Sequence, residues 1–450
     1  MEKVLQKLEV LMFARKIQKD IHEYFASGSE KILIVDGARQ VGKSFIIRYE
    51  GQRFFKNYIE LNMLEDSQGD RSFANVGSVD DFYIQLSTRA GDRMGEKGET
   101  LVFLDEIQTY PKLITLLKFL KQDNRFTYIA SGSLLGVTLR DEVASLPIGS
   151  VEIKRMFPMD FEEFLWANGV GQVAIDSLKD CFSSEKAPSE SLHNTIMKHF
   201  RMYLLSGGLP DAVKELVLNR NITSMRKVQD DIRAFYGADA SKYDTARKLK
   251  IKRIYDSIPS LMENRKKRVV VKNIEGKKGK TFEGYQDEFD YLISSGIALD
   301  VKAVSTPVFP LLQNSDKNLL KLYMNDVGIL TSVLYSLNIN SILNDENGIN
   351  LGSVYETAVA SELRSHGHDL FYYDNRKKGE VDFLVNDYES LSVIPVEVKS
   401  GKDYTIHAAL NRFISNPDYH VKRSYVFSNQ REIYKENGII YMPVYMIMFV

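Results

Sequence analysis

The sequence predicts an α/β protein that begins with a parallel sheet and ends in a second α/β region. Apolar runs, each followed by a helical pattern, recur at residues 31–37, 56–62, 100–106 and 126–132. Such runs are typical of buried parallel strands joined by crossover helices. Two further observations support this prediction. A glycine-rich motif follows the first run, and two apolar strands near the C-terminus carry acidic side chains.

The remaining elements follow in order along the chain. Residues 1–20 alternate apolar and charged side chains at helical spacing, which predicts an amphipathic helix. Helical patterns continue from Phe157 to about Asp239, and a later helix carries Glu356. We expect four segments: a sheet domain at 1–160, a helical lid at 161–241, a basic winged-helix-like region at 242–340 and a C-terminal α/β domain at 341–450.

Composition excludes several classes of protein. The 450 residues hold 59 Lys or Arg against 60 Asp or Glu, so the net charge of -1 excludes a protein that coats nucleic acid with its whole surface. The single cysteine, Cys181, excludes an intrachain disulfide framework and a thiolate zinc site. We expect a cytoplasmic protein with no membrane partner, because no apolar run approaches the ~20 residues of a membrane span and residues 1–20 lack a signal-peptide pattern.

The glycine-rich motif predicts a nucleotide site. It matches G-x-x-x-x-G-K-[ST] through Gly37, Ala38, Arg39, Gln40, Val41, Gly42, Lys43 and Ser44. In this motif the loop directs backbone N–H groups at phosphates, the lysine lies by the β- and γ-phosphates, and the hydroxyl binds Mg²⁺. The preceding strand and the following helix are the context that the motif requires. The predicted cofactors are ATP and Mg²⁺.

Two further strand ends supply candidate partners for the phosphates. The run Leu101–Leu104 ends in Asp105 and Glu106. We expect Asp105 to hold Mg²⁺ and Glu106 to polarise the attacking water. The next strand ends in Ser131 and Ser133, where a hydroxyl would contact the γ-phosphate or orient the water, although a simple turn explains these serines equally well.

These blocks resemble a family of prokaryotic AAA+ ATPases with a phosphate-loop domain, a helical and winged-helix region and a restriction-endonuclease-like C-terminal segment. The resemblance rests on GARQVGKS (37–44), LVFLDEIQ (101–108), ASGS (130–133), FPMDFEEFL (157–165), YLLSGGLP (203–210), GEVDFLV (379–385) and VEVKSG (396–401). It implies an AAA+ ATPase core over 1–160. The family usually carries a Gly-Arg pair where this sequence has Gly149-Ser150. Arg140 and Arg155 are nearby candidates for an arginine that acts on a neighbouring copy of the chain. The resemblance therefore allows a homo-oligomer.

The C-terminal strands carry the pattern of a metal-dependent nuclease. Glu397 and Lys399 share one face of a strand, and Asp382 lies on the strand before it. In the matching nuclease motif, Asp382 and Glu397 would bind Mg²⁺ and Lys399 would steady the attacking water, with Glu356 as a further acid. A half-exposed strand is the plain alternative for a Glu-x-Lys triplet, and such a fold can keep its acids without activity.

A local basic patch predicts DNA as a partner. Residues 242–280 hold 14 Lys or Arg and four acids, which would supply several phosphate contacts together with the C-terminal domain. The sequence therefore predicts an ATPase whose nucleotide state controls a DNA-binding, nuclease-like region. The alternative is a nucleotide-gated regulatory or protein-binding ATPase with a silent nuclease fold.

Overall fold

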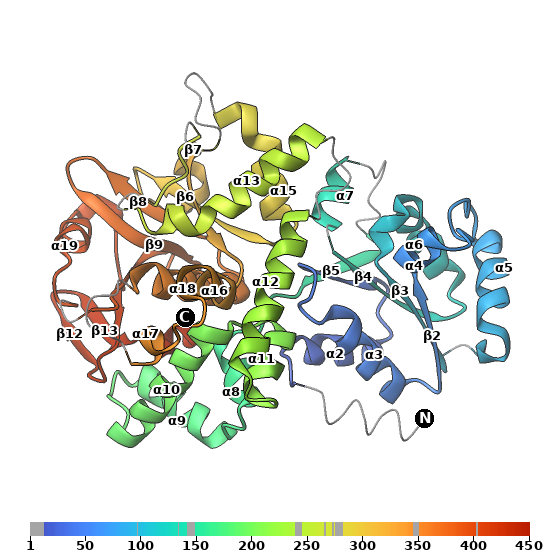
Figure 1. Cartoon of the computed structure of the whole chain (residues 1–450), viewed down its shortest axis with the longest axis horizontal. Coiled ribbons are helices and arrows are strands. Elements are labelled where there is room, and N and C mark those ends of the chain that lie inside the picture. The colour runs from blue at the N-terminus through green and yellow to red at the C-terminus, as the bar shows by residue number, and fades with distance from the viewer. Residues whose placement is uncertain are drawn as a thin grey trace. The chain divides into compact units, whose positions relative to one another are not determined.

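The computed structural model describes residues 13–96, 98–133, 135–141, 149–238, 245–264, 267–271, 274, 282–344, 351–401 and 404–450. The chain forms two compact units (Figure 1). The first comprises Met1–Phe157 with Ser294–Gly296, and the second comprises Pro158–Ile293 with Ile297–Val450. The second unit thus takes up most of the three segments expected after residue 160.

A parallel five-stranded sheet forms the centre of the first unit. Its strands are β1 (Ile32–Asp36), β2 (Asn57–Asn62), β3 (Thr100–Asp105), β4 (Thr127–Gly132) and β5 (Val151–Arg155). They lie in the order β2-β3-β4-β1-β5, and every neighbouring pair is parallel. The four strands expected from apolar runs are confirmed. All parallel strands end at one edge, so the ends of β1, β4 and β3 lie side by side.

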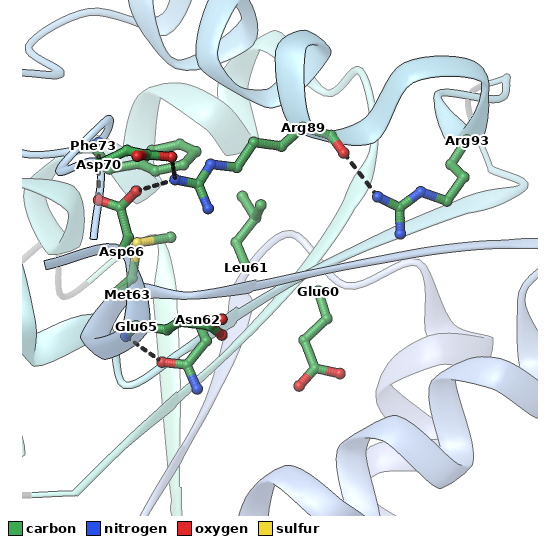
Figure 2. Close-up of a pocket in the computed structure, with 10 residues that line it drawn as sticks. All are labelled: Glu60, Leu61, Asn62, Met63, Glu65, Asp66, Asp70, Phe73, Arg89 and Arg93. Atoms are coloured by element: carbon green, nitrogen blue, oxygen red, sulfur yellow. Dashed lines mark hydrogen bonds and ion pairs between the residues drawn. The ribbon is translucent and has the colours of Figure 1, made fainter. Parts of the chain in front are cut away.

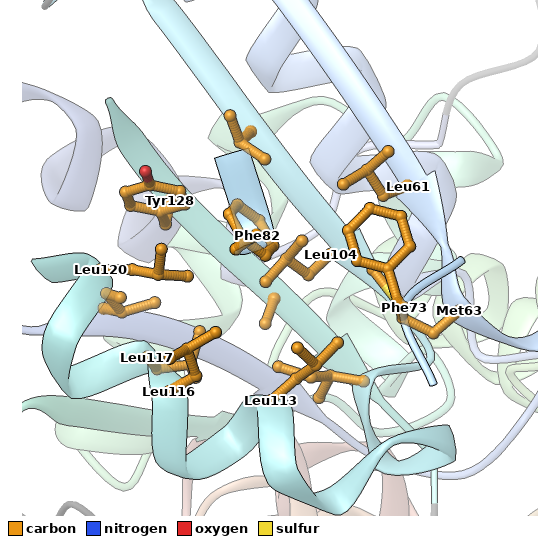
Figure 3. Packing of buried hydrophobic residues seen from close by; sticks show 14 of the residues in the cluster. Leu61, Met63, Phe73, Phe82, Leu104, Leu113, Leu116, Leu117, Leu120 and Tyr128 are labelled. Carbon is orange, nitrogen blue, oxygen red and sulfur yellow. The ribbon is translucent and has the colours of Figure 1, made fainter. Parts of the chain in front are cut away.

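Helices cover both faces of this sheet. They are α2 (Ile17–Ser27), α3 (Lys43–Phe54), α4 (Met63–Gln68), α5 (Val79–Ala90), α6 (Pro111–Asp123) and α7 (Leu135–Asp141). Phe82 of α5 and Leu113 and Leu117 of α6 pack on Leu104 and Tyr128 of the sheet (Figure 3). This core fixes β3 and β4, whose ends carry the candidate acids and serines. Of the helix expected over 1–20, residues 1–12 lie outside the described part.

Helices make up the first half of the second unit, as expected. These are α8 (Phe161–Ala167), α9 (Gln172–Ser183), α10 (Glu190–Ser206), α11 (Pro210–Val217), α12 (Ile222–Ala238) and α13 (Thr245–Met262). The later helices are α15 (Gln286–Ser294), α16 (Val327–Tyr335), α17 (Asn340–Leu343), α18 (Gly352–Ser365) and α19 (Ala408–Ile414). Among the described residues, no helix has the length and apolar character needed to cross a membrane.

A mixed eight-stranded sheet completes the second unit. Its strands are β6 (Ala298–Val304), β7 (Ser315–Met324), β8 (Phe371–Asn375), β9 (Gly379–Asp387), β10 (Ser392–Val398), β11 (Tyr425–Ser428), β12 (Tyr434–Glu436) and β13 (Ile439–Pro443). They lie in the order β12-β13-β11-β10-β9-β8-β6-β7. The prediction of a separate winged-helix module needs correction here, because its strand pair, β6 and β7, continues the C-terminal sheet through a parallel β6–β8 pairing.

Candidate functional site

The phosphate loop joins the end of β1 to the start of α3. Gly37 has a φ of 147°, and a Cβ at this residue would lie 2.1 Å from the carbonyl oxygen of Met156. Gly42, with a φ of 99°, precedes the first residue of α3. Both positions require glycine, because other residues avoid this backbone region. The glycines thus allow the loop to turn tightly onto the positive end of a helix, which favours phosphate.

Lys43 is the first residue of α3 and is buried. Its ammonium group donates hydrogen bonds to the carbonyl oxygens of Gly37 at 2.9 Å and Ala38 at 2.8 Å. Burial lowers the pKa of Lys43, while the nearby Glu106, Asp36 and Asp105 oppose this effect. The amine therefore lies inside the loop, beside carboxylates that partly offset the effect of burial on its pKa.

Asp105 connects the loop to the neighbouring strands. Its Oδ1 accepts hydrogen bonds from the Ser44 hydroxyl at 2.8 Å and from the Ser131 hydroxyl. Burial raises the pKa of this carboxyl group, and the two serine hydroxyls oppose the shift. A hydroxyl and a carboxylate oxygen side by side are the donors that Mg²⁺ prefers, so Ser44 and Asp105 fit the predicted magnesium site.

Glu106 lies in a second polar group at the same edge. Its backbone has a φ of 54°, which turns the side chain away from the line of β3. Its Oε2 accepts hydrogen bonds from the Ser133 hydroxyl at 2.6 Å and from the Gln108 amide. The structure thus brings together the predicted Lys43, Ser44, Asp105, Glu106, Ser131 and Ser133.

Sequence reasoning missed two residues that position these groups. Gln108, which is buried, donates to both Glu106 and Ser133. Arg15 donates to the carbonyl oxygen of Val41 in the phosphate loop at 2.9 Å. Gln108 stands in the LVFLDEIQ block of the resemblance, but no residue pattern there indicates its partners. No pattern indicates the contact of Arg15 either, because its partner lies 26 residues away along the chain.

Of the two arginine candidates, only Arg155 has a described side chain. Its guanidinium lies 4.0 Å from the carboxylate of Asp36 at the end of β1. The side chain of Arg140 lies outside the described residues. Arg39, by contrast, reaches from the phosphate loop to Ser133, with Nε 3.2 Å from the hydroxyl oxygen.

A polar cavity of about 410 Å³ lies beside the end of β2 (Figure 2). Arg89 bridges Asp66 at 2.7 Å and Asp70 at 3.6 Å across it. Asn62, also in its wall, lies 3.5 Å from Asp105 Oδ2. The phosphate loop does not line the cavity, and the acids in its wall outnumber the arginines, which disfavours a phosphate group. We therefore do not assign the nucleotide to it.

The C-terminal candidates form one charged cluster in the second unit. Lys399 lies 2.9 Å from Glu397, and Asp382 accepts a hydrogen bond from the backbone of Val398 at 2.9 Å. Burial raises the pKa of Asp382 well above its usual range, and the negative charges of Glu397 and Glu356 add to this effect. The charges of Asp382, Glu397, Lys399 and Glu356 therefore lie close enough to influence one another.

Two further lysines complete this cluster. Lys267 forms an ion pair with Glu356. Lys321, 1% exposed, lies 2.5 Å from Glu380. Burial alone would lower the pKa of Lys321, yet Glu380, Glu356 and Asp382 raise it. Within the described residues, no group of three or more His, Cys, Asp or Glu side chains is arranged to hold a metal ion.

Much of the predicted basic patch is paired with acids. Seven of its 14 basic residues lie in the described part of the chain. Five of these form ion pairs: Arg247 with Asp287, Lys250 with Glu288, Lys252 with Asp256, Lys267 with Glu356 and Arg268 with Asp374. Four of these acids lie outside the basic segment, so the local charge is lower than the segment's composition predicts.

Comparison with known families identifies the first unit. Residues 29–165 match the family model of an AAA domain. This part of the chain is similar to an AAA domain. The match spans the phosphate loop and the ends of β3 and β4, and it confirms the expected phosphate-loop ATPase core. Residues 197–341 and 351–447 match two domains of unknown function, DUF8612 and DUF4143, so the nuclease-like identity stays a prediction.

Solved structures show distant similarity. A Walker-type ATPase of Pyrococcus abyssi is 14% identical with a TM-score of 0.44, over 72% of this chain and 96% of its own. The ORC2 protein of Aeropyrum pernix is 12% identical with a TM-score of 0.36, over 73% and 92%. RuvB of Thermotoga maritima, a Holliday junction branch migration motor, is 14% identical with a TM-score of 0.28, over 66% and 88%. No curated protein matches the sequence significantly.

Proposed function

We propose that the chain is a Mg²⁺-dependent ATPase. The observation that carries this proposal is the hydrogen-bonded series Ser44–Asp105–Ser131 beside the buried Lys43, within an AAA domain. Lys43 would exchange its two carbonyl partners for the β- and γ-phosphates, and the α3 N-terminus would face the same charge. Glu106 would orient the attacking water and accept its proton. Ser44 and Asp105 would hold Mg²⁺, which neutralises phosphate charge when bound.

Substitution of Lys43 tests this proposal. Lys43→Ala removes the charge directed at the phosphates, so we expect ATP binding, measured by isothermal titration, and phosphate release to be lost. Lys56→Ala is a matched control, because Lys56 is an exposed lysine of the same unit that pairs with Glu99 at 3.0 Å. Unchanged ATP affinity and turnover in Lys43→Ala would refute the assignment of the phosphate loop.

We further propose that the nucleotide state controls the second unit and that DNA is its partner. The basic segment supports this proposal, although the ion pairs described above reduce the number of phosphate contacts it offers. Lys248→Ala with Arg253→Ala should lower affinity for any DNA sequence and flatten the slope of log K against log [salt] by about two. Lys252→Ala is the control, because Lys252 already pairs with Asp256. A wild-type protein that does not bind DNA at low salt would contradict the proposal.

A second candidate is a regulatory ATPase whose C-terminal cluster is catalytically silent. It is favoured by the pairing of Lys399 with Glu397 and of Lys267 with Glu356, because a metal would need these carboxylates. Cleavage of DNA by the purified protein with Mg²⁺ or Mn²⁺ and ATP, abolished by Asp382→Ala or Lys399→Ala, would decide for the nuclease. Absence of cleavage with normal ATP turnover would decide for the silent fold.

A further inference from the structure

Arg39 belongs to the phosphate loop, yet its side chain connects to two other strand ends. Its Nε donates to the Ser133 hydroxyl at 3.2 Å, and that hydroxyl donates to Glu106 at 2.6 Å. Because β4 lies between β1 and β3 in the sheet, Arg39 extends from the loop across the end of β4 toward Glu106. It thus spans the space between the lysine and the glutamate of the proposed ATPase site.

Arg39 lies close enough to Lys43 for its positive charge to act on the lysine. Burial is the main cause that lowers the pKa of Lys43, and the positive charge of Arg39 adds to this effect. Arg155, the arginine suggested by the sequence, instead lies by Asp36. The loop therefore brings a second cation to the phosphate side of Glu106.

We propose that Arg39 supplies, within a single chain, the arginine charge that stabilises the γ-phosphate oxygens during hydrolysis. The proposal rests on the proposed ATPase function. Water held by Glu106 forms a bond to the γ-phosphorus, the bond from that phosphorus to the β–γ bridging oxygen breaks, and Glu106 receives the water proton. ADP and phosphate result. An arginine that stabilises this transition state typically raises the rate by ~10³ to 10⁵.

Two substitutions separate charge from hydrogen bonding. Arg39→Gln keeps a donor for Ser133 and loses the charge, whereas Arg39→Lys keeps the charge. We expect Arg39→Gln to reduce kcat by ~10³, Arg39→Lys to retain more activity than Arg39→Gln, and both to bind ADP, which lacks the γ-phosphate, within about twofold of the wild type. Affinity for ADP with aluminium fluoride, a transition-state analogue, should fall in Arg39→Gln. Arg125→Gln, at an exposed arginine of the same unit that pairs with Asp123 at 3.5 Å, is the control.

Mixing variants tests whether the arginine acts within one chain. Arg39→Gln mixed with Lys43→Ala should stay inactive, whereas an arginine acting on a neighbour would restore turnover. Recovery in the mixture, or wild-type kcat in Arg39→Gln, would overturn the inference, as would greater activity in Arg39→Gln than in Arg39→Lys. If Lys43→Ala is inactive while Arg39→Gln is normal, only this inference fails. If Lys43→Ala keeps wild-type turnover, the proposed function fails first.

Discussion

At the scale of single residues, the polar side chains at the carboxyl edge of the first sheet form two separate groups. Asp105 contacts Ser44 and Ser131, whereas Glu106 contacts Ser133 and Gln108. The two adjacent acids diverge because the backbone of Glu106 is left-handed, with a φ of 54°. Substitution of one acid should therefore leave the function of the other intact.

Glu106→Gln tests this separation. We expect it to keep the nucleotide affinity of the wild type and to lose turnover by ~10² or more, because an amide cannot accept the water proton. Glu65→Gln, at an exposed acid of α4, provides the control for loss of a negative charge in this unit. Wild-type phosphate release by Glu106→Gln would remove Glu106 from the mechanism and leave Asp105 as the functional acid of this pair.

The sequence predicts side chains that the fold brings together at this edge, but it does not predict the residues that position them. Motif spacing places Lys43 and Ser44 at the start of the helix that follows β1. It places Asp105 and Ser131 at the ends of β3 and β4, and a parallel sheet brings these strand ends to one edge. The hydrogen bonds of Gln108 to Glu106 and Ser133 depend on the backbone turn at Glu106, and no local residue pattern predicts this turn. Arg15 depends on a contact with Val41 from a distant part of the chain. The local sequence pattern indicates which helix or strand carries a side chain. The contacts of that side chain depend on how several helices and strands pack together.

At the scale of elements, Asp326 joins two parts of the second unit. Its carboxylate accepts hydrogen bonds from the backbone N–H groups of Ile329, at the start of α16, at 3.1 Å and Gly208 at 2.7 Å. Burial raises its pKa to about 6. A Cβ on Gly207 would lie 2.0 Å from the same carboxylate. The Gly207-Gly208 pair thus fits against the cap of α16.

Asp326→Ala should destabilise the second unit by about 2–4 kcal/mol, because it removes a helix cap and leaves a buried N–H group unpaired. Unfolding in urea, followed by the fluorescence of Trp166, the single tryptophan, measures this free energy. Gly207→Ala should also lower the free energy of unfolding of the second unit. This loss should be smaller by at least about 1 kcal/mol in the Asp326→Ala background than in the wild type, because the colliding carboxylate is absent there. Strict additivity of the two changes would contradict the close contact.

Strands were easier to predict than their order in the second sheet. Apolar runs predict β9 and β10, two strands that are consecutive in the sequence and pair with each other. The β6–β8 pairing joins segments about 70 residues apart, and no local pattern specifies it. The charge of the basic segment was overestimated for the same reason, because Asp287, Glu288, Glu356 and Asp374 approach it only in the folded chain.

At the scale of the whole molecule, buried and half-buried histidines should give the second unit a pH dependence. Burial lowers the pKa values of His193, His199, His368 and His407 from the ordinary 6.5. The unfolded chain therefore binds more protons than the folded unit below about pH 6.5. These histidines should reduce the free energy of unfolding as pH falls through that value.

A histidine double variant isolates this effect. His193 and His407 each form a hydrogen bond to a tyrosine hydroxyl, at 3.0 and 2.8 Å. Replacing both with glutamine removes two titrating groups, so the loss of stability between pH 7.5 and pH 5.5, followed through Trp166, should be smaller than in the wild type. Equal losses in both proteins would show that these histidines do not contribute.

In the C-terminal cluster, three ammonium groups face the four carboxylates of Glu356, Glu380, Asp382 and Glu397. Lys321→Met removes a buried counter-charge, which should destabilise the second unit by ~3–5 kcal/mol. The control is Lys302→Met, because Lys302 is 42% exposed and lies 3.5 Å from Asp300; its loss should cost less than about 1 kcal/mol.

Magnesium then distinguishes a silent cluster from a metal site. Without nucleotide, added Mg²⁺ should raise the Trp166 unfolding midpoint of Lys321→Met, in which surplus carboxylates lack a cation, by binding to the folded state. The wild type should show no such shift, because its lysines already neutralise these carboxylates. A Mg²⁺-dependent rise of the wild-type midpoint that Asp382→Ala removes would show that the lysines do not replace the metal. That result would favour the nuclease over the regulatory ATPase.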